Sequence, residues 1–120
     1  MAEYVDGFIV PIPKKNIDAY KKMAKKAAKV WKEYGAIDYR ECIADDVPYG
    51  KTTSFPRSVD RKNSETVVFS WITYKSRAQR DKANAAVMQD PRIKKIIEES
   101  GDIMDSSRMI WGGFETIVKL

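Results

Sequence analysis

The sequence contains no histidine, and this absence excludes several kinds of chemistry. Nucleophile pairs that need a histidine base are excluded, and so are zinc and iron sites with histidine ligands. No side chain has an unperturbed pKa near neutrality. Any acid–base work would therefore fall to a carboxylate, a lysine, a tyrosine or the one thiol, with a shifted pKa.

Cysteine occurs once, as Cys42, so the chain cannot form an internal disulfide. No apolar run approaches the roughly 20 residues that a membrane-spanning helix needs. The segment MAEYVDGFIV lacks the basic region and the cleavable apolar region of a signal peptide. Because thiols stay reduced in the cytoplasm, we expect a cytoplasmic protein that is not inserted in a membrane.

Two motifs of cofactor sites are also missing. Gly112-Gly113 lies inside a predicted strand and indicates a bulge or a close approach, not a phosphate loop. No metal-ligand spacing is present: Glu41, Asp45 and Asp46 could form an oxygen-only cluster, but nothing in their spacing demands one. We therefore expect neither a metal nor another cofactor.

What is present is typical of one globular domain. The chain has 120 residues, of which 43% are hydrophobic and 32% charged, so we predict a single domain over residues 1–120. The net charge of +5 is concentrated at the beginning, where residues 1–36 carry eight lysines and four acidic residues. The basic excess is a local stripe.

Turn, cap and alternation signals divide the chain into seven elements. We predict strands at 4–12, 36–44, 65–74 and 108–118. A helix with an apolar stripe runs from the N-cap Asn16 to Gly35, and a helix at 77–89 begins with a capping box at Ser76. Asp90-Pro91 starts a shorter helix that ends at Gly101. A connection with no regular element fills about 45–62.

The order strand–helix–strand, strand–helix–strand predicts an α+β fold, a ferredoxin-like βαββαβ sandwich with a four-stranded antiparallel sheet. In that topology the strand at 65–74 is central. Six of its eight residues Val67–Tyr74 are large and apolar or aromatic, and they lie on both faces. One face can be covered by helices of the same chain, and we expect a second copy to cover the other.

Several segments together resemble the YbaA-like family of uncharacterised bacterial proteins. They are YVDGFIVPIPK, ECIADDVPYGKTTSFPR, ETVVFSWITY with the following RDKANAAVMQDPR, and RMIWGGFE. The family is similar to the dimeric α/β-barrel (ABM-like) superfamily, in which two ferredoxin-like subunits press their open sheet faces together around a cavity. The resemblance implies a homodimer.

The superfamily includes cofactor-independent monooxygenases that oxidise polycyclic phenols, heme-degrading enzymes and members without known activity. The resemblance supplies no catalytic residues, because none are established for the family. Many relatives in the superfamily place a histidine in the cavity. The absence of histidine here counts against a direct transfer of heme or phenol chemistry.

Charged residues within predicted strands are the first candidates for a site. Asp6 shares a strand face with Phe8 and is the best acid–base candidate if that face lines a cavity. Glu41 lies in the second predicted strand and is a candidate ligand contact. The alternative for such carboxylates is an edge position or a structural ion pair.

The long connection supplies a second set of candidates, because loops of this length are often lids. Phe55 and Arg57 could place an anchored aromatic ring beside a cation that meets an anionic or phenolic ligand. The alternative is a surface loop pinned by Phe55, or one that contacts the other subunit. Trp71 and Trp111 could line a cavity for a flat ligand, or lie in the core or the dimer interface. For Cys42 a buried structural position is favoured.

We therefore state two hypotheses. In the first, a homodimer binds a small apolar or aromatic molecule in a cavity between sheet and helices, and any activity is a cofactor-independent oxidation or isomerisation. Asp6 and Arg57 would be catalytic, and Phe8, Glu41, Phe55, Trp71 and Trp111 would contact the ligand. In the second, the protein is a non-enzymatic interaction module whose basic first helix contacts nucleic acid or an acidic partner. Nucleic acid is the less expected partner, because the predicted strands carry no RNA-binding motif.

Overall fold

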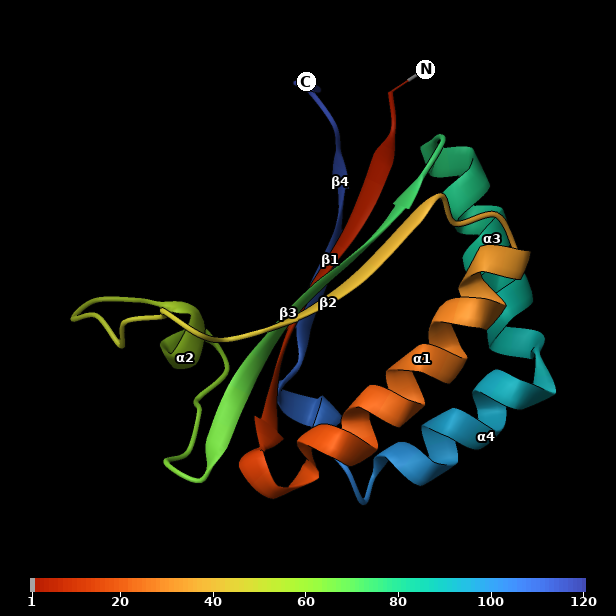
Figure 1. Ribbon diagram of the computed structural model, residues 1–120. Helices are drawn as coiled ribbons and strands as arrows, with labels where there is room; N and C mark the ends of the chain where they lie inside the picture. The colour runs from red at the N-terminus through yellow and green to blue at the C-terminus, as the bar shows by residue number, and fades with distance from the viewer. Residues whose placement is uncertain (1) are drawn as a thin grey trace.

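The computed structural model describes residues 2–120 (Figure 1). In chain order its elements are β1 (Tyr4–Pro13), the 3₁₀ turn η1 (Lys14–Asn16), α1 (Ile17–Glu33), β2 (Asp38–Ile43), α2 (Phe55–Ser58), β3 (Glu65–Tyr74), α3 (Arg77–Gln89), α4 (Pro91–Ser100), the 3₁₀ turn η2 (Ser106–Arg108) and β4 (Ile110–Glu115). The sheet order is β2-β3-β1-β4, and every pair is antiparallel. The predicted α+β fold is confirmed, with β1 and β3 in the centre.

The two faces of the sheet have different surroundings. Helices α1, α3 and α4 all lie on one side, whereas α2 and its flanking loop lie on the other (Figure 1). On β3, Ser70, Ile72 and Tyr74 face the helices and are buried, while Phe69 on the opposite face is 41% exposed. The chain thus covers one face of its central strand and leaves the other face largely open.

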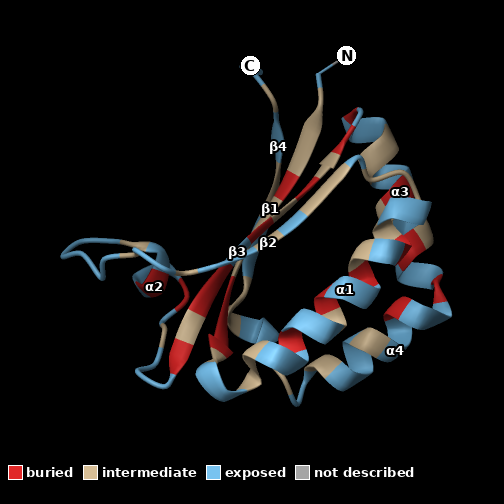
Figure 2. Ribbon diagram, in the orientation of Figure 1, coloured by how far each residue is buried: buried red, intermediate tan, exposed pale blue. Residues whose placement is uncertain are grey.

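Helix α1 packs its predicted apolar stripe against the sheet. Tyr20, Ala24 and Ala27 are buried, and Figure 2 shows buried positions on the side of α1 that faces the sheet. The opposite side of the helix carries the exposed lysines Lys21, Lys22, Lys25, Lys26, Lys29 and Lys32. No helix within residues 2–120 combines the length and the apolar character that crossing a bilayer would require.

Two of the predicted helix starts have the expected caps. The Ser76 hydroxyl accepts a hydrogen bond from the Gln79 amide N–H at 3.1 Å, and the Asp90 carboxylate accepts one from the Arg92 N–H at 2.8 Å. Each bond satisfies a backbone donor that has no partner within its helix. Gly35 follows α1 with a φ of +109°. Glycine adopts such positive values easily, which agrees with the helix end predicted at this residue.

Asn16 is the N-cap residue of α1, as predicted, but its side chain makes no capping hydrogen bond. A 3₁₀ turn leads directly into the helix. The Asn16 amide instead donates to the Ile103 carbonyl at 3.0 Å, which ties the start of α1 to the segment before β4.

The last strand is shorter than the predicted 108–118. It ends at Glu115, which pairs with Tyr4, the first residue of β1. One further backbone hydrogen bond, from the Thr116 N–H to the Glu3 carbonyl at 3.0 Å, continues beyond the strand. Arg108 lies before the strand, in η2. The second strand is also shorter than 36–44, since it runs from Asp38 to Ile43.

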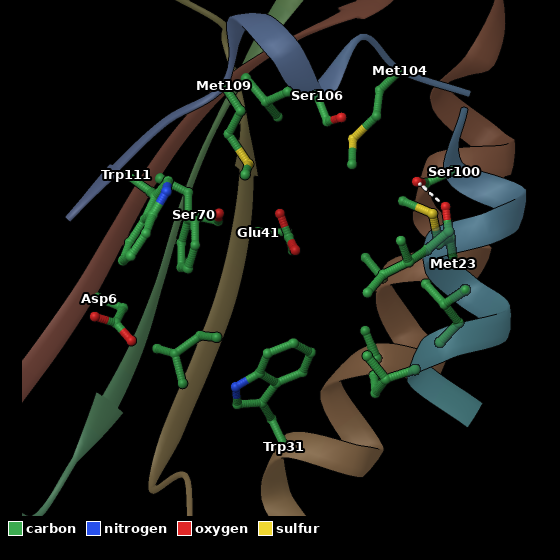
Figure 3. Close-up of a pocket in the computed structure, with 18 of the residues that line it drawn as sticks. Asp6, Met23, Trp31, Glu41, Ser70, Ser100, Met104, Ser106, Met109 and Trp111 are labelled. Atoms are coloured by element: carbon green, nitrogen blue, oxygen red, sulfur yellow. Dashed lines mark hydrogen bonds between the residues drawn. The ribbon is translucent and has the colours of Figure 1, made fainter. Parts of the chain in front are cut away.

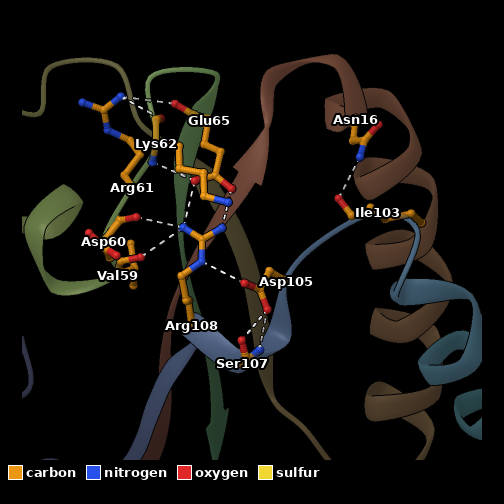
Figure 4. Close-up of polar contacts among 10 residues, drawn as sticks. All are labelled: Asn16, Val59, Asp60, Arg61, Lys62, Glu65, Ile103, Asp105, Ser107 and Arg108. Atoms are coloured by element: carbon orange, nitrogen blue, oxygen red, sulfur yellow. Dashed lines mark hydrogen bonds and ion pairs between the residues drawn. The ribbon is translucent and has the colours of Figure 1, made fainter.

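Arg108 holds three separate segments together (Figure 4). Its guanidinium donates to both oxygens of Glu65 on β3, at 2.9 and 2.5 Å, and to the carbonyl of Asp60 at 2.9 Å. Its Nε donates to the Asp105 carboxylate at 2.9 Å. Glu65 is only 5% exposed. This network anchors the end of the long loop to the start of β3 and to the turn before β4.

The Arg108 network predicts a pH-dependent contribution to stability. The hydrogen bonds from Arg108, supported by the Lys62 N–H, hold the pKa of Glu65 below its usual 4.5 against the opposing effect of burial. A carboxyl with a lowered pKa stabilises the fold fully above its unfolded pKa, and the contribution is lost as the pH falls below that value. Glu65→Gln should therefore cost about 3 kcal/mol at pH 7.

Urea unfolding at several pH values measures this effect. The difference in unfolding free energy between the natural protein and Glu65→Gln should be largest above pH 4.5 and shrink below it. Glu98→Gln, at an exposed position of α4, is the matched control and should show a small difference throughout. A Glu65→Gln difference that is independent of pH would contradict the assigned role of the ion pair.

Candidate functional site

A cavity of about 510 Å³ lies between the sheet and the helices (Figure 3). This size is within the range of small-molecule sites. Its floor is formed by the helix-facing residues of the strands, and its walls by α1, α3 and α4. The lining is mostly apolar, and the sheet side consists of Asp6, Phe8, Val10, Tyr39, Glu41, Ser70, Ile72 and Trp111.

Short side chains leave the space open. Ala24 and Ala27 face the sheet from α1, and Ser70 occupies the middle of β3 between Val68 and Ile72. Four methionines also line the cavity, namely Met23, Met88, Met104 and Met109. Methionine side chains are flexible and polarisable, so they adapt to the shape of an apolar neighbour.

Glu41 is the principal polar group within the cavity. Its Oε1 accepts a hydrogen bond from the Tyr20 hydroxyl at 2.6 Å, and its Oε2 accepts one from the Tyr39 hydroxyl at 2.7 Å. Burial, reinforced by the charge of Glu41, raises the pKa of both tyrosines. Both phenols therefore stay protonated and keep donating to the carboxylate.

Glu41 has no cationic partner in the structure. Within residues 2–120 it takes part in no ion pair, and the described cavity lining contains neither lysine nor arginine. Its two hydrogen-bond partners are neutral. An ionised carboxylate in an apolar surrounding is costly unless it is paired, so the cavity contains a charge that a ligand could compensate.

Asp6 is also at the cavity wall, but its charge is already balanced. It is 2% exposed, and both of its oxygens accept hydrogen bonds from the Arg80 Nε, at 3.0 and 3.1 Å. The Asn84 amide donates to Asp6 at 3.4 Å and accepts from the Tyr74 hydroxyl at 3.1 Å. Burial, with the charge of Asp6, raises the pKa of Tyr74 to about 12. Asp6 thus forms a structural ion pair, which was the alternative to a catalytic role for this carboxylate.

The remaining candidates lie on the opposite face of the sheet. Phe55 stacks edge-on against Phe69 with ring centroids 5.8 Å apart, and Phe69 contacts Trp71 in the same way at 5.6 Å. The Trp71 indole N–H donates to Asp38 at 3.1 Å. Arg57 lies over another aromatic ring, that of Tyr49, at 4.1 Å.

The structure therefore divides the candidate residues into two groups. Asp6, Phe8, Glu41 and Trp111 meet at the cavity. Phe55, Arg57 and Trp71 do not, because odd-numbered residues of β3 face away from the helices and the long loop extends on that side (Figure 1). The hypothesis that the long loop covers this cavity does not agree with the structure, because the sheet separates the two.

The side chains that the sequence did not single out are Tyr20, Tyr39 and Asn84. Alternation alone places Tyr39 on the same strand face as Glu41, two residues away, so this contact could have been found. Tyr20 lies 21 residues before Glu41, and only the packing of α1 on the sheet brings the two together. Within residues 2–120, no three acidic, histidine or cysteine side chains converge as a metal site requires.

The burial predicted for Cys42 is wrong in this chain. Cys42 is exposed. It lies on the edge strand β2, opposite Phe69 in the register, and it faces the open side of the sheet. No helix of the same chain covers that position.

Solved structures with the same architecture share little sequence with this chain. A conserved protein of unknown function and possible oxidoreductase from Bacteroides thetaiotaomicron has a TM-score of 0.61 at 15% identity, over 96% of this chain and 98% of that one. A dimeric ferredoxin-like protein from an uncultured marine organism has a TM-score of 0.58 at 15% identity, over 98% and 99%. These likenesses establish the ferredoxin-like fold.

Sequence comparison identifies closer relatives. The uncharacterised protein YbaA of Escherichia coli K12 is 51% identical over 118 residues, which cover 97% of each chain. The family described as a protein of unknown function (DUF1428) matches residues 3–105. The resemblance noted from the sequence is thereby confirmed, and the chain belongs to the DUF1428 family.

Proposed function

We propose that this protein is a homodimer that binds a small, largely apolar molecule in the cavity of each subunit, with Glu41 as the polar anchor. The observation that carries the proposal is the carboxylate itself. It lies in a mostly apolar cavity and is held by two phenols, and no basic side chain of residues 2–120 pairs with it. A binding site with many apolar contacts and a few placed polar groups is the usual form of a small-molecule site.

The hydrogen-bond partners of Glu41 define what the ligand offers. An ionised carboxylate only accepts hydrogen bonds and has about four lone-pair positions. Tyr20 and Tyr39 occupy one position on each oxygen. The ligand therefore presents an O–H or N–H donor to Glu41, and its apolar part contacts Phe8, Trp111 and the methionines.

Any reaction in this cavity would begin with proton transfer from the ligand to a carboxylate. We assign that role first to Glu41, because Asp6 is engaged by the Arg80 guanidinium. Return of the proton from Glu41 to a carbon of the ligand, with a shift of the double bond toward the deprotonated atom, would give an isomerisation. Transfer of two electrons from the deprotonated ligand to dioxygen, which takes up two protons and leaves as hydrogen peroxide, would give an oxidation. One of the solved neighbours is described as a possible oxidoreductase.

Filling the cavity should abolish ligand binding. Ser106 is an exposed residue of η2 that lines the cavity, so Ser106→Trp should fold and place its ring in the space. With N-phenyl-1-naphthylamine, a neutral probe that fluoresces in apolar sites and carries one N–H donor, the variant should bind at least tenfold more weakly than the natural protein. Titration by fluorescence measures the affinity.

Lys29→Trp adds the same ring to the exposed side of α1 and is the matched control. It should bind the probe as the natural protein does. Equal affinity of the Ser106→Trp variant would contradict binding in this cavity.

The open face of the sheet supports the homodimer. It carries exposed apolar side chains, among them Phe114 at 64%, Ile110 at 43% and Phe69 at 41%. Contiguous apolar surfaces of this kind usually mark interfaces. A dimeric ferredoxin-like protein among the structural neighbours agrees with this arrangement.

Phe114→Asp should convert the dimer into a folded monomer. The side chain is too exposed to contribute much to the core, but a symmetric interface would lose two phenylalanines and gain two buried charges. The dimer dissociation constant should rise by at least about 100-fold, which light scattering during gel filtration detects. Circular dichroism checks that the variant is folded.

Ile37→Asp is the control. Ile37 is 47% exposed, but it lies two residues before Tyr39 and therefore on the helix side of the sheet, away from the open face. It should remain dimeric. A natural protein that is monomeric at micromolar concentration would refute the proposed dimer.

A further inference from the structure

We infer that the cavity selects an organic cation, a protonated amine on an apolar or aromatic skeleton, over neutral and anionic molecules of the same shape. This inference rests on the proposed ligand binding and specifies the class of ligand.

The charges that line the cavity are the first argument. Its described lining includes two carboxylates and no basic residue. Asp6 is neutralised by Arg80, whose Nη2 lies 2.9 Å from Oδ1. Within residues 2–120, the half-buried Glu41 accepts side-chain hydrogen bonds only from two neutral phenols. The apolar enclosure thus carries one uncompensated negative charge, which a cation relieves and a second anion would aggravate.

The position of Glu41 is the second argument. Figure 3 shows the Glu41 carboxylate between Trp31 and Met109, among the side chains that line the cavity. The two phenols fix its orientation, since each donates to a different oxygen. A ligand group in the cavity therefore meets a carboxylate that is already oriented and needs little reorganisation to bind it.

The aromatic lining is the third argument. Trp31 and Tyr39 lie with ring centroids 6.3 Å apart, and Tyr39 is itself a hydrogen-bond partner of Glu41. A cation bound to the carboxylate would share the cavity with these aromatic side chains, and the faces of aromatic rings attract positive charge. Phe8 and Trp111 contribute further aromatic surface for the skeleton of the ligand.

A ligand with a hydroxyl in place of the ammonium group would make only part of these interactions. It can donate to Glu41, but it leaves the negative charge in place and gains nothing electrostatic from the rings. A hydrogen bond between two charged groups is stronger than one with a single charged partner. The preference of the cavity for an amine over an alcohol is therefore expected to reach at least about tenfold, which corresponds to about 1.4 kcal/mol.

Three indoles of similar size test the inference: tryptamine, tryptophol and indole-3-acetate, which differ in the charge at the end of the side chain. Isothermal titration calorimetry at pH 7 with the natural protein should rank tryptamine at least tenfold above tryptophol and should detect no binding of indole-3-acetate. This ranking needs no variant, so it does not depend on the folding of a mutant.

Glu41→Gln tests the origin of the ranking. It should reduce tryptamine affinity at least tenfold, leave tryptophol within about threefold and remove most of the difference between them. Glu98→Gln removes the same charge from an exposed position of α4 and should preserve the ranking. Ser106→Trp should weaken every indole that binds.

The outcomes separate the two proposals. Equal binding of the three indoles, or a preference for indole-3-acetate, would overturn the amine preference. If this binding is lost in Ser106→Trp, the cavity remains a binding site. A preference for tryptamine that survives in Glu41→Gln would also overturn it. Absence of any binding that depends on the cavity would overturn both proposals.

Discussion

The pairing of β1 with β3 is the constraint on which the rest of the structure depends. The two strands pair over ten residues, from Tyr4 opposite Tyr74 to Pro13 opposite Glu65. Because successive side chains point to opposite faces, a shift of one residue would exchange the two faces completely. This register directs Asp6 and Ser70 toward the helices and Trp71 away from them, and it thereby separates the cavity from the surface assigned to the second subunit.

Two carboxylates on one sheet face differ in their chemistry because of their partners. Asp6 is tied to Arg80 and Asn84, which connect β1 to α3 and leave the carboxylate little capacity for a ligand. Glu41 is held by tyrosines from α1 and β2, which orient the carboxylate without cancelling its charge. The same functional group therefore joins two elements of the fold at one position, and at the other it has the arrangement on which the proposed ligand recognition rests.

The structural features that could be predicted from the sequence are those that depend on residues close together in the chain. The strand at 65–74, the helix at 77–89 and the caps at Ser76 and Asp90 all follow from local patterns, and the structure reproduces them. Predictions that depend on distant contacts were less successful. The amide of Asn16 bonds to residue 103, and the Tyr20–Glu41 contact joins a helix to a strand. Alternation divided the side chains of β3 into two faces but did not say which face the helices cover, so it left open whether Trp71 lines this cavity, and in the structure Trp71 faces the other side.

The four methionines form a part of the cavity wall whose shape can adapt, because their side chains are flexible. Long unbranched thioether side chains change rotamer at little cost, so ligands with carbon skeletons of different shape could pack against them. The polar groups, in contrast, are held in place by hydrogen bonds. In the evolution of such a site, the size of the ligand can drift through substitutions at methionine positions, while the chemical group that is recognised changes only when the carboxylate or its tyrosines change.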